Sequence, residues 1–237
     1  MIMAVIIWGY LYLSFPDVVV YKNTNPESSA LIEFRKNEAK TNGKNLNIKL
    51  KWISYNKIPV TLRKAIVVAE DASFWVHKGF DWFEVKESIF TNLTEGEYSR
   101  GASTITQQLA KNLFLSPQKS IFRKVVEVYL TMKLEKNLSK TRILELYMNI
   151  IEFGEGIFGT GRATDYYFGK YPPELTVSEI VRLAAVIPSP LRLRPDKPSN
   201  GLKWRSKIVL ERLYYYKFIT ESEYLQARQD LENFFEI

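Results

Sequence analysis

The sequence predicts a mostly α-helical globular protein, and three observations support this prediction. Its 237 residues, 46% of them hydrophobic, suit one domain with a sizeable core. Apolar residues recur at helical spacing from Pro59 onward. Ser or Thr precedes several of these stretches as a helix cap, and Thr176 and Thr220 are each followed three residues later by Glu, as in a capping box.

The first element is an uncharged apolar run from Met1 to Phe15. As a helix it would span about 22 Å, short of the roughly 30 Å hydrocarbon core of a bilayer. A cleaved signal peptide would begin with basic residues, and a buried core helix would show a polar face; this run has neither. Trp8, Tyr10 and Tyr12 suit a membrane interface. We therefore expect residues 1–16 to form a transmembrane anchor that lacks some N-terminal residues.

Residues 17–51 are polar and rich in turn-forming residues, and we expect them to form a connecting region. Two short strands are predicted to begin there, Leu31–Phe34 and Leu46–Ile53. Residues 52–237 are expected to form one helical domain, with a loop at the glycines between residues 153 and 161. Its predicted helices are Val60–Glu70, Trp82–Leu93, Ser103–Leu115, Ile121–Asn137, Lys140–Ile150, Gly159–Phe168, Thr176–Ile187, Leu202–Tyr216 and Thr220–Phe234.

Composition excludes several kinds of chemistry. The sequence has no cysteine, which excludes disulfides, cysteine-ligated zinc and a cysteine nucleophile. Its single histidine, His77, excludes within one chain a metal site that needs two. The net charge of +7 predicts an anionic partner, namely nucleic acid, a phosphorylated ligand or an anionic membrane. Residues 111–142 hold eight Lys or Arg against two Glu, so we expect this partner near the middle of the chain.

The first candidate site is the pair Glu70 and Asp71, at the predicted end of a helix. Acids at a helix C-terminus face the negative end of the helix dipole, which favours their neutral form and suits a general base or acid. A solvated acidic turn is the alternative. His77 could orient one of these acids through a hydrogen bond, although a lone histidine is more often structural.

The second candidate site is the helix predicted to begin at Ser103. Ser103, Gln107 and Lys111 are spaced to share one face, opposite a stripe of Ile and Leu. A polar face with only one charge suits the binding of a sugar or a phosphate. An ordinary amphipathic surface helix is the alternative.

The third candidate site is Glu127, which lies one helical turn after Arg123 and Lys124. A carboxylate beside two cations stays ionised, and the cations suit a diphosphate. A surface ion pair is the alternative. Glu127 and Glu70 together supply the two carboxylates typical of chemistry at an anomeric carbon. The buried face of this helix is predicted to comprise Val125, Val128, Tyr129 and Met132.

These stretches together resemble the peptidoglycan glycosyltransferase family, which polymerises lipid II. The matching motifs are residues 70–81, residues 101–111 and Arg123-Lys124-x-x-Glu127. Further matches follow at residues 143–149, 152–159 and 167–170, so the resemblance extends from about residue 52 to residue 198 in the family's order.

The resemblance implies the monofunctional biosynthetic type of enzyme, with no transpeptidase domain. Such an enzyme has one transmembrane helix in the bacterial inner membrane and one catalytic domain on the periplasmic side. The implied fold is lysozyme-like, with a smaller membrane-dipping lobe whose predicted surface includes Phe80, Trp82, Phe83 and Ile89. The implied partners are lipid II, the nascent glycan chain, membrane lipid and the cell-wall synthesis machinery, with no nucleic acid.

The resemblance also implies residue roles. Glu70 matches the base that takes a proton from the 4-hydroxyl of the acceptor sugar, which attacks the growing chain with inversion as undecaprenyl diphosphate leaves. Glu127 matches a second carboxylate near the diphosphate, acting directly or by holding Mg²⁺ or Mn²⁺, although no cofactor is expected to be required. Substrate-binding residues would be Ser103, Gln107, Lys111, Lys119, Arg123, Lys124 and Lys133, and supporting residues would be Asp71, Phe74, His77 and Thr104.

Two positions depart from many relatives. Lys119 stands where Arg is common, and lysine lacks the bidentate geometry that arginine offers a phosphate. Val126 stands where Lys is common, which removes a cation next to Glu127. We therefore expect weaker binding of the diphosphate, offset in part by Lys133.

Two other functions fit parts of the pattern. A lytic muramidase would use the same two carboxylates, but it has little use for a row of cations beside Glu127. A membrane-tethered binder of nucleic acid or anionic lipid would use the cations as a patch, with binding that falls steeply as salt rises. Glu70 would be dispensable for such a binder.

Overall fold

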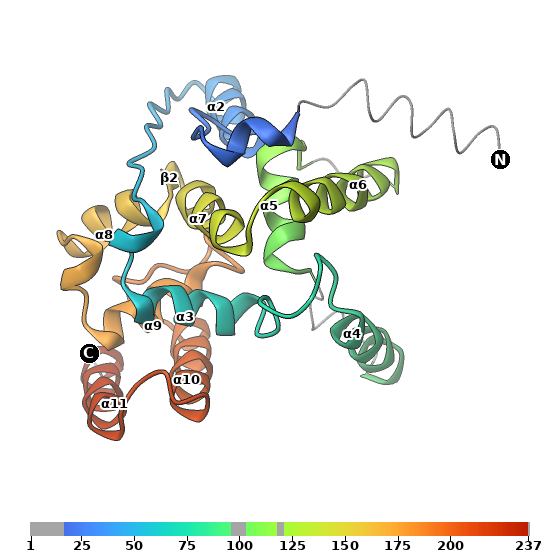
Figure 1. Cartoon of the computed structure of the whole chain (residues 1–237). Helices are drawn as coiled ribbons and strands as arrows, with labels where there is room; N and C mark the ends of the chain where they lie inside the picture. The colour runs from blue at the N-terminus through green and yellow to red at the C-terminus, as the bar shows by residue number, and fades with distance from the viewer. Residues whose placement is uncertain (1–16, 96–102, 118–120, 237) are drawn as a thin grey trace, which may run out of the picture.

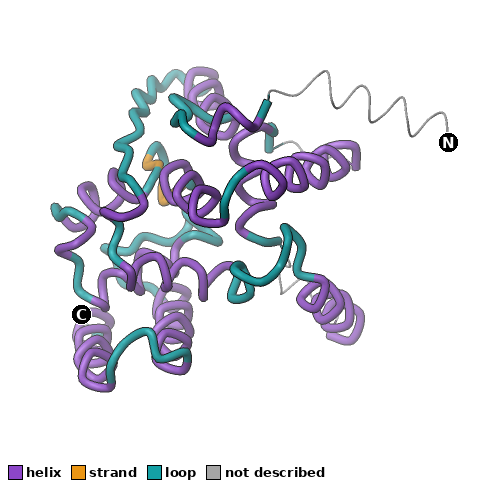
Figure 2. The backbone as a smooth tube through the Cα atoms, viewed as in Figure 1, coloured by secondary structure: helices purple, strands orange, loops and turns teal. Residues whose placement is uncertain are grey.

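A computed structural model of the chain describes residues 17–95, 103–117 and 121–236. Most of these residues are helical, as predicted (Figure 1; Figure 2). The anchor predicted for residues 1–16 lies outside the described residues. Within the described ranges, no helix combines the length and the apolar character that a bilayer span requires.

The helices from α3 onward follow one another in the predicted order. The bounds of α3, α6 and α7 are those predicted, and the other predicted helices begin and end within two residues of expectation. The elements are η1 (Val18–Lys22), α2 (Ala30–Thr41), η2 (Tyr55–Lys57), α3 (Val60–Glu70), α4 (Trp82–Glu95), α5 (Ile105–Phe114), α6 (Ile121–Asn137), α7 (Lys140–Ile150), β1 (Glu152–Gly154), β2 (Ile157–Phe158), α8 (Thr160–Phe168), η3 (Pro172–Glu174), α9 (Val177–Val186), α10 (Asn200–Tyr215) and α11 (Glu221–Phe235).

Both strands predicted near the N-terminus are wrong. Residues 31–34 belong to α2, which Ser29 caps by accepting a hydrogen bond from the backbone N–H of Ile32. Residues 46–53 form no strand. The Asn149 side chain accepts from the backbone N–H of Ile53 and donates to its carbonyl oxygen, both at 2.8 Å. One side-chain amide therefore satisfies both backbone groups of Ile53, the last residue of the predicted strand.

A two-stranded antiparallel hairpin, β1 and β2, lies where a loop was predicted. The chain passes from β2 to α8 through Gly159, which has a φ of +76°. A Cβ atom on Gly159 would lie 2.4 Å from the carbonyl oxygen of Asn149, at the end of α7. Only glycine therefore allows the hairpin to return this closely against α7.

The core is built from helices that pack on both sides of α3 and α5. α5 contacts α2, α6 and α7, while α3 contacts α9 and α10. Leu62 and Ile66 of α3 and Leu109 of α5 are fully buried in one continuous cluster. In Figure 1, α10 and α11 lie side by side at one end of the molecule, and α4 stands apart from the other helices. The C-terminal end of α3 lies against the N-terminal end of α5, where Asp71 accepts a hydrogen bond from the backbone N–H of Ile105. The segment between these two helix ends contains α4.

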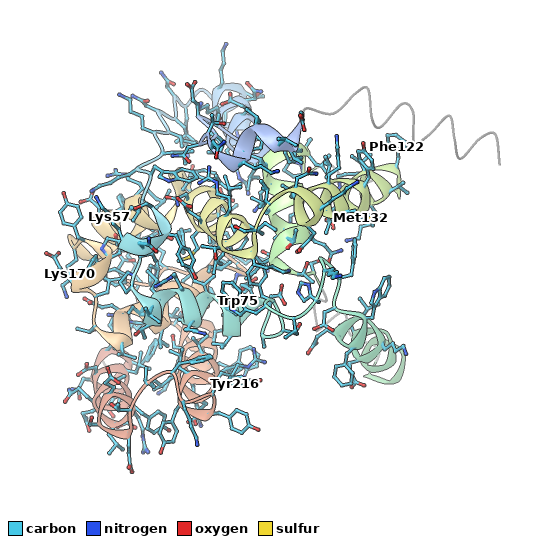
Figure 3. All side chains as sticks on the ribbon, viewed as in Figure 1. Lys57, Trp75, Phe122, Met132, Lys170 and Tyr216 are labelled. Carbon is cyan, nitrogen blue, oxygen red and sulfur yellow. The ribbon has the colours of Figure 1, made fainter. Side chains whose placement is uncertain are left out.

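The buried face of α6 matches the prediction at Tyr129, which is 6% exposed, but differs from it at other positions. Val126 is 2% exposed, whereas Val125 and Met132 are 46% and 49% exposed. Phe122 and Met132, labelled in Figure 3, are both about half exposed. The face is rotated by about one residue, or roughly 100°, and it carries Val126, Leu130 and Leu134 together with Glu127. Val126 therefore packs in the core, so a lysine at this position would be buried rather than presented to a diphosphate.

Candidate active site

Asp71 joins the end of α3 to the start of α5. Its Oδ2 accepts a hydrogen bond from the backbone N–H of Ile105 at 2.9 Å, at the N-terminus of α5, where negative charge is favourable. His77 Nε2 lies 3.0 Å from both carboxylate oxygens of Asp71, and Gly79 N–H donates to His77 Nδ1. Because Nδ1 accepts, Nε2 carries the proton and donates to Asp71. His77 thus orients an acid, and this acid is Asp71.

Thr104 is the N-cap of α5. Its hydroxyl donates to the Gly79 carbonyl oxygen at 2.7 Å, and Oγ1 also accepts from the backbone N–H of Gln107. The Gln107 side chain completes a capping box by accepting from the backbone N–H of Thr104 at 3.0 Å. Gln107 is only 7% exposed, so the structure places this predicted substrate ligand in the cap.

The polar face predicted for Ser103, Gln107 and Lys111 does not form. α5 begins at Ile105, so Ser103 precedes the helix and does not follow its periodicity. Ser103 is exposed, Gln107 is buried, and Lys111 is half-buried near the end of the helix. Of the three, Lys111 carries a charge that interacts with both candidate carboxylates.

Glu70, the last residue of α3, is held by Gln108 of α5. Gln108 Nε2 donates to Glu70 Oε2 at 2.8 Å, and the Tyr147 hydroxyl of α7 donates to Gln108 Oε1 at 2.9 Å. Glu70 Oε1 is buried and has no hydrogen-bond partner among the described residues. Burial raises the pKa of the Glu70 carboxyl, and the Gln108 hydrogen bond and the charges of Arg205 and Lys111 oppose this rise.

The sequence prediction missed Gln108, Tyr147 and Arg205. The capping-box spacing Thr104-x-x-Gln107 could have assigned Gln107 to the helix cap, which would leave its neighbour as the free amide. Tyr147 lies in a stretch that matched the family, but no spacing rule connects it to Glu70. Arg205 lies in α10, far away in sequence, and only the fold brings it into electrostatic range of Glu70.

Glu127 lies among cations, as predicted. Its side chain is buried, Lys124 Nζ donates to its Oε1, and Arg123 approaches its Oε2 at 3.7 Å. Burial lowers the pKa of Lys111, which the charge of Glu127 and, more weakly, that of Glu70 raise. Lys111 therefore lies within electrostatic range of both carboxylates and connects the two halves of the site.

The remaining predicted residues have varied positions. Phe74 is fully buried and packs in the core, with Lys140 Nζ 4.5 Å from the centre of its ring. Lys133 Nζ lies 5.3 Å from the centre of the Tyr129 ring. Lys119 lies outside the described residues.

The donor atoms near Glu127 do not suit a divalent cation. Within the described parts of the chain, no group of three or more His, Asp or Glu side chains could hold a metal ion. Both oxygens of Glu127 already face Lys124 and Arg123, and these positive charges would repel a cation.

Comparisons with known proteins identify the family. A family model described as Transglycosylase matches residues 37–214. Biosynthetic peptidoglycan transglycosylases are similar to this chain: that of Nitrosospira multiformis is 37% identical over 208 residues, covering 88% of this chain and 90% of its own length. That of Methylobacillus flagellatus is 36% identical, covering 87% and 90%, and that of Neisseria gonorrhoeae is 35% identical, covering 84% and 85%.

Penicillin-binding protein 1A from Haemophilus influenzae is a solved structure that matches 76% of this chain and 17% of its own, at 18% identity and a TM-score of 0.42. This likeness is too low to support a conclusion about the fold. The family match and the curated relatives each cover most of the chain. The chain therefore belongs to the transglycosylase family, among the biosynthetic peptidoglycan transglycosylases, and is a glycosyltransferase.

Proposed function

We propose that this enzyme polymerises glycan chains by inverting transfer from a lipid-diphosphate-linked growing chain to the 4-hydroxyl of lipid II. The observation that carries the proposal is the environment of Glu70. One of its oxygens is held by Gln108, while Oε1 is buried without a partner among the described residues. Burial also raises the pKa of this carboxyl, which makes it a stronger base than an exposed glutamate. Oε1 is the atom proposed to take the proton of the attacking hydroxyl.

The cations around Glu127 are proposed to bind the leaving diphosphate. Lys111, Arg123 and Lys124 bring positive charge to one place, and charge that develops on a leaving group is stabilised best by charges already in position. Glu127 holds Arg123 and Lys124 by direct ion pairs, so its proposed role is to position them. No step in this proposal passes through a metal ion or a cofactor.

The loop that precedes α4 and the first turn of α4 are proposed to contact the lipid that carries the substrate. Trp82 and Phe83 are 69% and 70% exposed, and Val76 in the preceding loop is 83% exposed. Phe80 packs beside Trp82, with ring centroids 5.8 Å apart. Exposed aromatic residues of this kind favour a membrane interface. We propose that this surface contacts the membrane, and that the enzyme acts at the periplasmic face of the bacterial inner membrane.

The proposed activity includes no transpeptidation. The match covers 90% of the length of relatives whose names state only transglycosylase activity. Lipid II, the nascent glycan chain and membrane lipid are the proposed partners, with the cell-wall synthesis machinery as a further one.

A gel assay of lipid II polymerisation with Glu70→Gln tests this function. We expect the rate to fall by about 10²–10⁴-fold, the usual contribution of a general base, with an unchanged circular dichroism spectrum. Glu155→Gln, a change to an exposed glutamate that pairs with Lys44 at 3.4 Å, should polymerise normally. Full activity of Glu70→Gln would overturn the assignment of the base. Release of soluble fragments from finished cell wall, without polymerisation of lipid II, would indicate a hydrolase instead.

A further inference from the structure

Three side chains form a chain of hydrogen bonds that starts in the core and ends at Glu70. The Tyr147 hydroxyl donates to Gln108 Oε1 at 2.9 Å, and Gln108 Nε2 donates to Glu70 Oε2 at 2.8 Å. Tyr147 is fully buried in α7, among the largest buried side chains. Its position is therefore fixed by packing, whereas Gln108 is only partly buried.

The direction of these hydrogen bonds matters because a glutamine amide has two different ends. One end accepts hydrogen bonds and the other donates them. As long as Tyr147 donates to Oε1, the NH₂ group faces Glu70. A reversed amide would place its oxygen against the carboxylate, which is unfavourable when Glu70 is ionised. Gln108 Nε2 also lies 3.4 Å from the Ser103 carbonyl oxygen, but this contact is long.

Tyr147 is suited to be a permanent donor. Burial raises the pKa of its hydroxyl well above the ordinary value, and the nearby charges of Glu70 and Asp71 raise it further. The hydroxyl therefore keeps its proton throughout the range in which Glu70 titrates, and it donates to Gln108 in both protonation states of Glu70.

We infer that Tyr147 is a positioning residue for glycosyl transfer: it fixes the Gln108 amide so that its NH₂ group holds the Glu70 carboxylate in its ionised, proton-accepting form. This inference rests on the proposed role of Glu70 as the base. Tyr147 is buried and its hydroxyl is hydrogen-bonded to Gln108, so it acts on Glu70 through Gln108.

The other charged groups that face Glu70 would stay in place if the Tyr147 hydroxyl were removed. They are Asp71, the next residue in the chain, Lys111 on α5 and Arg205 on α10. Tyr147→Phe removes one oxygen atom and keeps the ring that packs in the core. Its effect on Glu70 should therefore come from the freed amide alone.

The test is the pH profile of kcat for lipid II polymerisation by Tyr147→Phe. We expect the acidic limb of the profile to move to higher pH, because a disordered or reversed amide stabilises ionised Glu70 less well. On that limb, kcat falls about tenfold for each pH unit of displacement, while KM for lipid II changes little. Tyr167→Phe is the matched control, since the Tyr167 hydroxyl donates to a carbonyl oxygen, that of Phe153, at 3.0 Å. Its profile should remain that of the unmodified enzyme.

A double-variant cycle distinguishes an effect of Tyr147 through Gln108 from a general disturbance of the fold. In a Gln108→Ala background, Tyr147→Phe should cause no further displacement of the profile, because the amide through which it acts is gone. An unchanged profile for Tyr147→Phe, an equal shift for Tyr167→Phe, or additive shifts in the cycle would each overturn the inference. Full activity of Glu70→Gln would instead overturn the proposed function itself, so the two failures can be distinguished.

Discussion

At the scale of single residues, two adjacent acids have opposite environments. Asp71 accepts hydrogen bonds from His77 and from the N-terminus of α5, so both of its oxygens have partners. Glu70 receives one hydrogen bond, and its second oxygen is buried without a partner among the described residues. Asp71 therefore stabilises the structure, whereas its neighbour Glu70 has the environment expected of the proposed base, since different environments can give chemically similar groups different roles.

Glu70 should cost stability at neutral pH. Its pKa is higher in the folded protein than the ordinary 4.5, so the folded state binds this proton more tightly than the unfolded state does. Stability from this group is therefore fully present below pH 4.5 and is lost as pH rises through the raised pKa. We expect Glu70→Gln, which stays neutral, to raise Tm at pH 7.5 but not at pH 4. Each 1 kcal/mol gained corresponds to about 2–4 °C in a domain of this size.

Thermal unfolding of both proteins followed by circular dichroism from pH 4 to pH 8 measures this difference. Glu155→Gln serves as the exposed control, and its Tm should equal that of the unmodified protein at every pH. A Tm for Glu70→Gln that lies below that of the unmodified protein at pH 7.5 would contradict the expectation.

At the scale of elements, α5 carries two neighbouring glutamines with different functions. Gln107 closes the capping box with Thr104, and Gln108 lies about 100° further around the helix and faces Glu70. Two adjacent positions therefore hold an amide that caps the helix and an amide that binds the proposed base.

Substitution of Gln107 should lower stability, whereas substitution of Gln108 should lower activity. Gln107→Ala removes half of a capping box, so we expect a loss of about 1 kcal/mol in the free energy of unfolding with most activity retained. Gln108→Ala should lower the rate of polymerisation at least about tenfold, as expected when the ionised form of a base loses its hydrogen bond, with the smaller effect on the free energy of unfolding. Urea unfolding and the lipid II gel assay on both variants measure the two effects. The reverse pattern would show that the roles are exchanged.

Helix bounds were predictable from sequence where local chemistry determines them. α7 starts after the Ser139 cap, and α9 and α11 start after capping boxes, all of which the sequence shows directly. The buried face of α6 was not predictable, because apolar residues occur on more than one side of this helix and only tertiary packing selects Val126 over Val125.

The candidate site was predictable in part for the same reason. Glu127 and its cations are neighbours on one helix, so spacing alone placed them together. The groups that determine the environment of Glu70, directly or through Gln108, come from α5, α7 and α10, which are distant in sequence, so spacing could not identify Tyr147 or Arg205. The predicted strand at residues 46–53 was wrong, and the Asn149 side chain that binds the backbone of its last residue, Ile53, comes from α7, which is distant in sequence.

At the scale of the whole molecule, the proposed membrane surface and the α10–α11 pair lie at different places. α4 stands apart from the other helices, whereas α10 and α11 pack together at the lower end in Figure 1. Large exposed side chains occur at both places, including Trp82 on α4 and Trp204 on α10, at 69% and 62% exposure.

Replacing the exposed aromatic residues of α4 should weaken membrane binding. We expect a Trp82→Ser, Phe83→Ser double variant to bind vesicles that contain anionic lipid at least about tenfold more weakly, because burying each large apolar side chain contributes about 1.5–3 kcal/mol. Trp204→Ser is the matched control and should bind like the unmodified protein. Vesicle sedimentation measures the partition, and equal weakening by both changes would place the lipid contact elsewhere.

The segment that contains α4 begins after Asp71 and ends at Thr104, and these two ends lie against each other. Asp71 is bonded to Ile105, 34 residues later, and Gly79 is bonded to Thr104. These two hydrogen bonds hold together the two ends of the segment that contains α4. Because these contacts lie beside Glu70 and Gln108, we expect changes in the length or hydrophobicity of α4 to leave the 2.8 Å hydrogen bond between Gln108 and Glu70 in place.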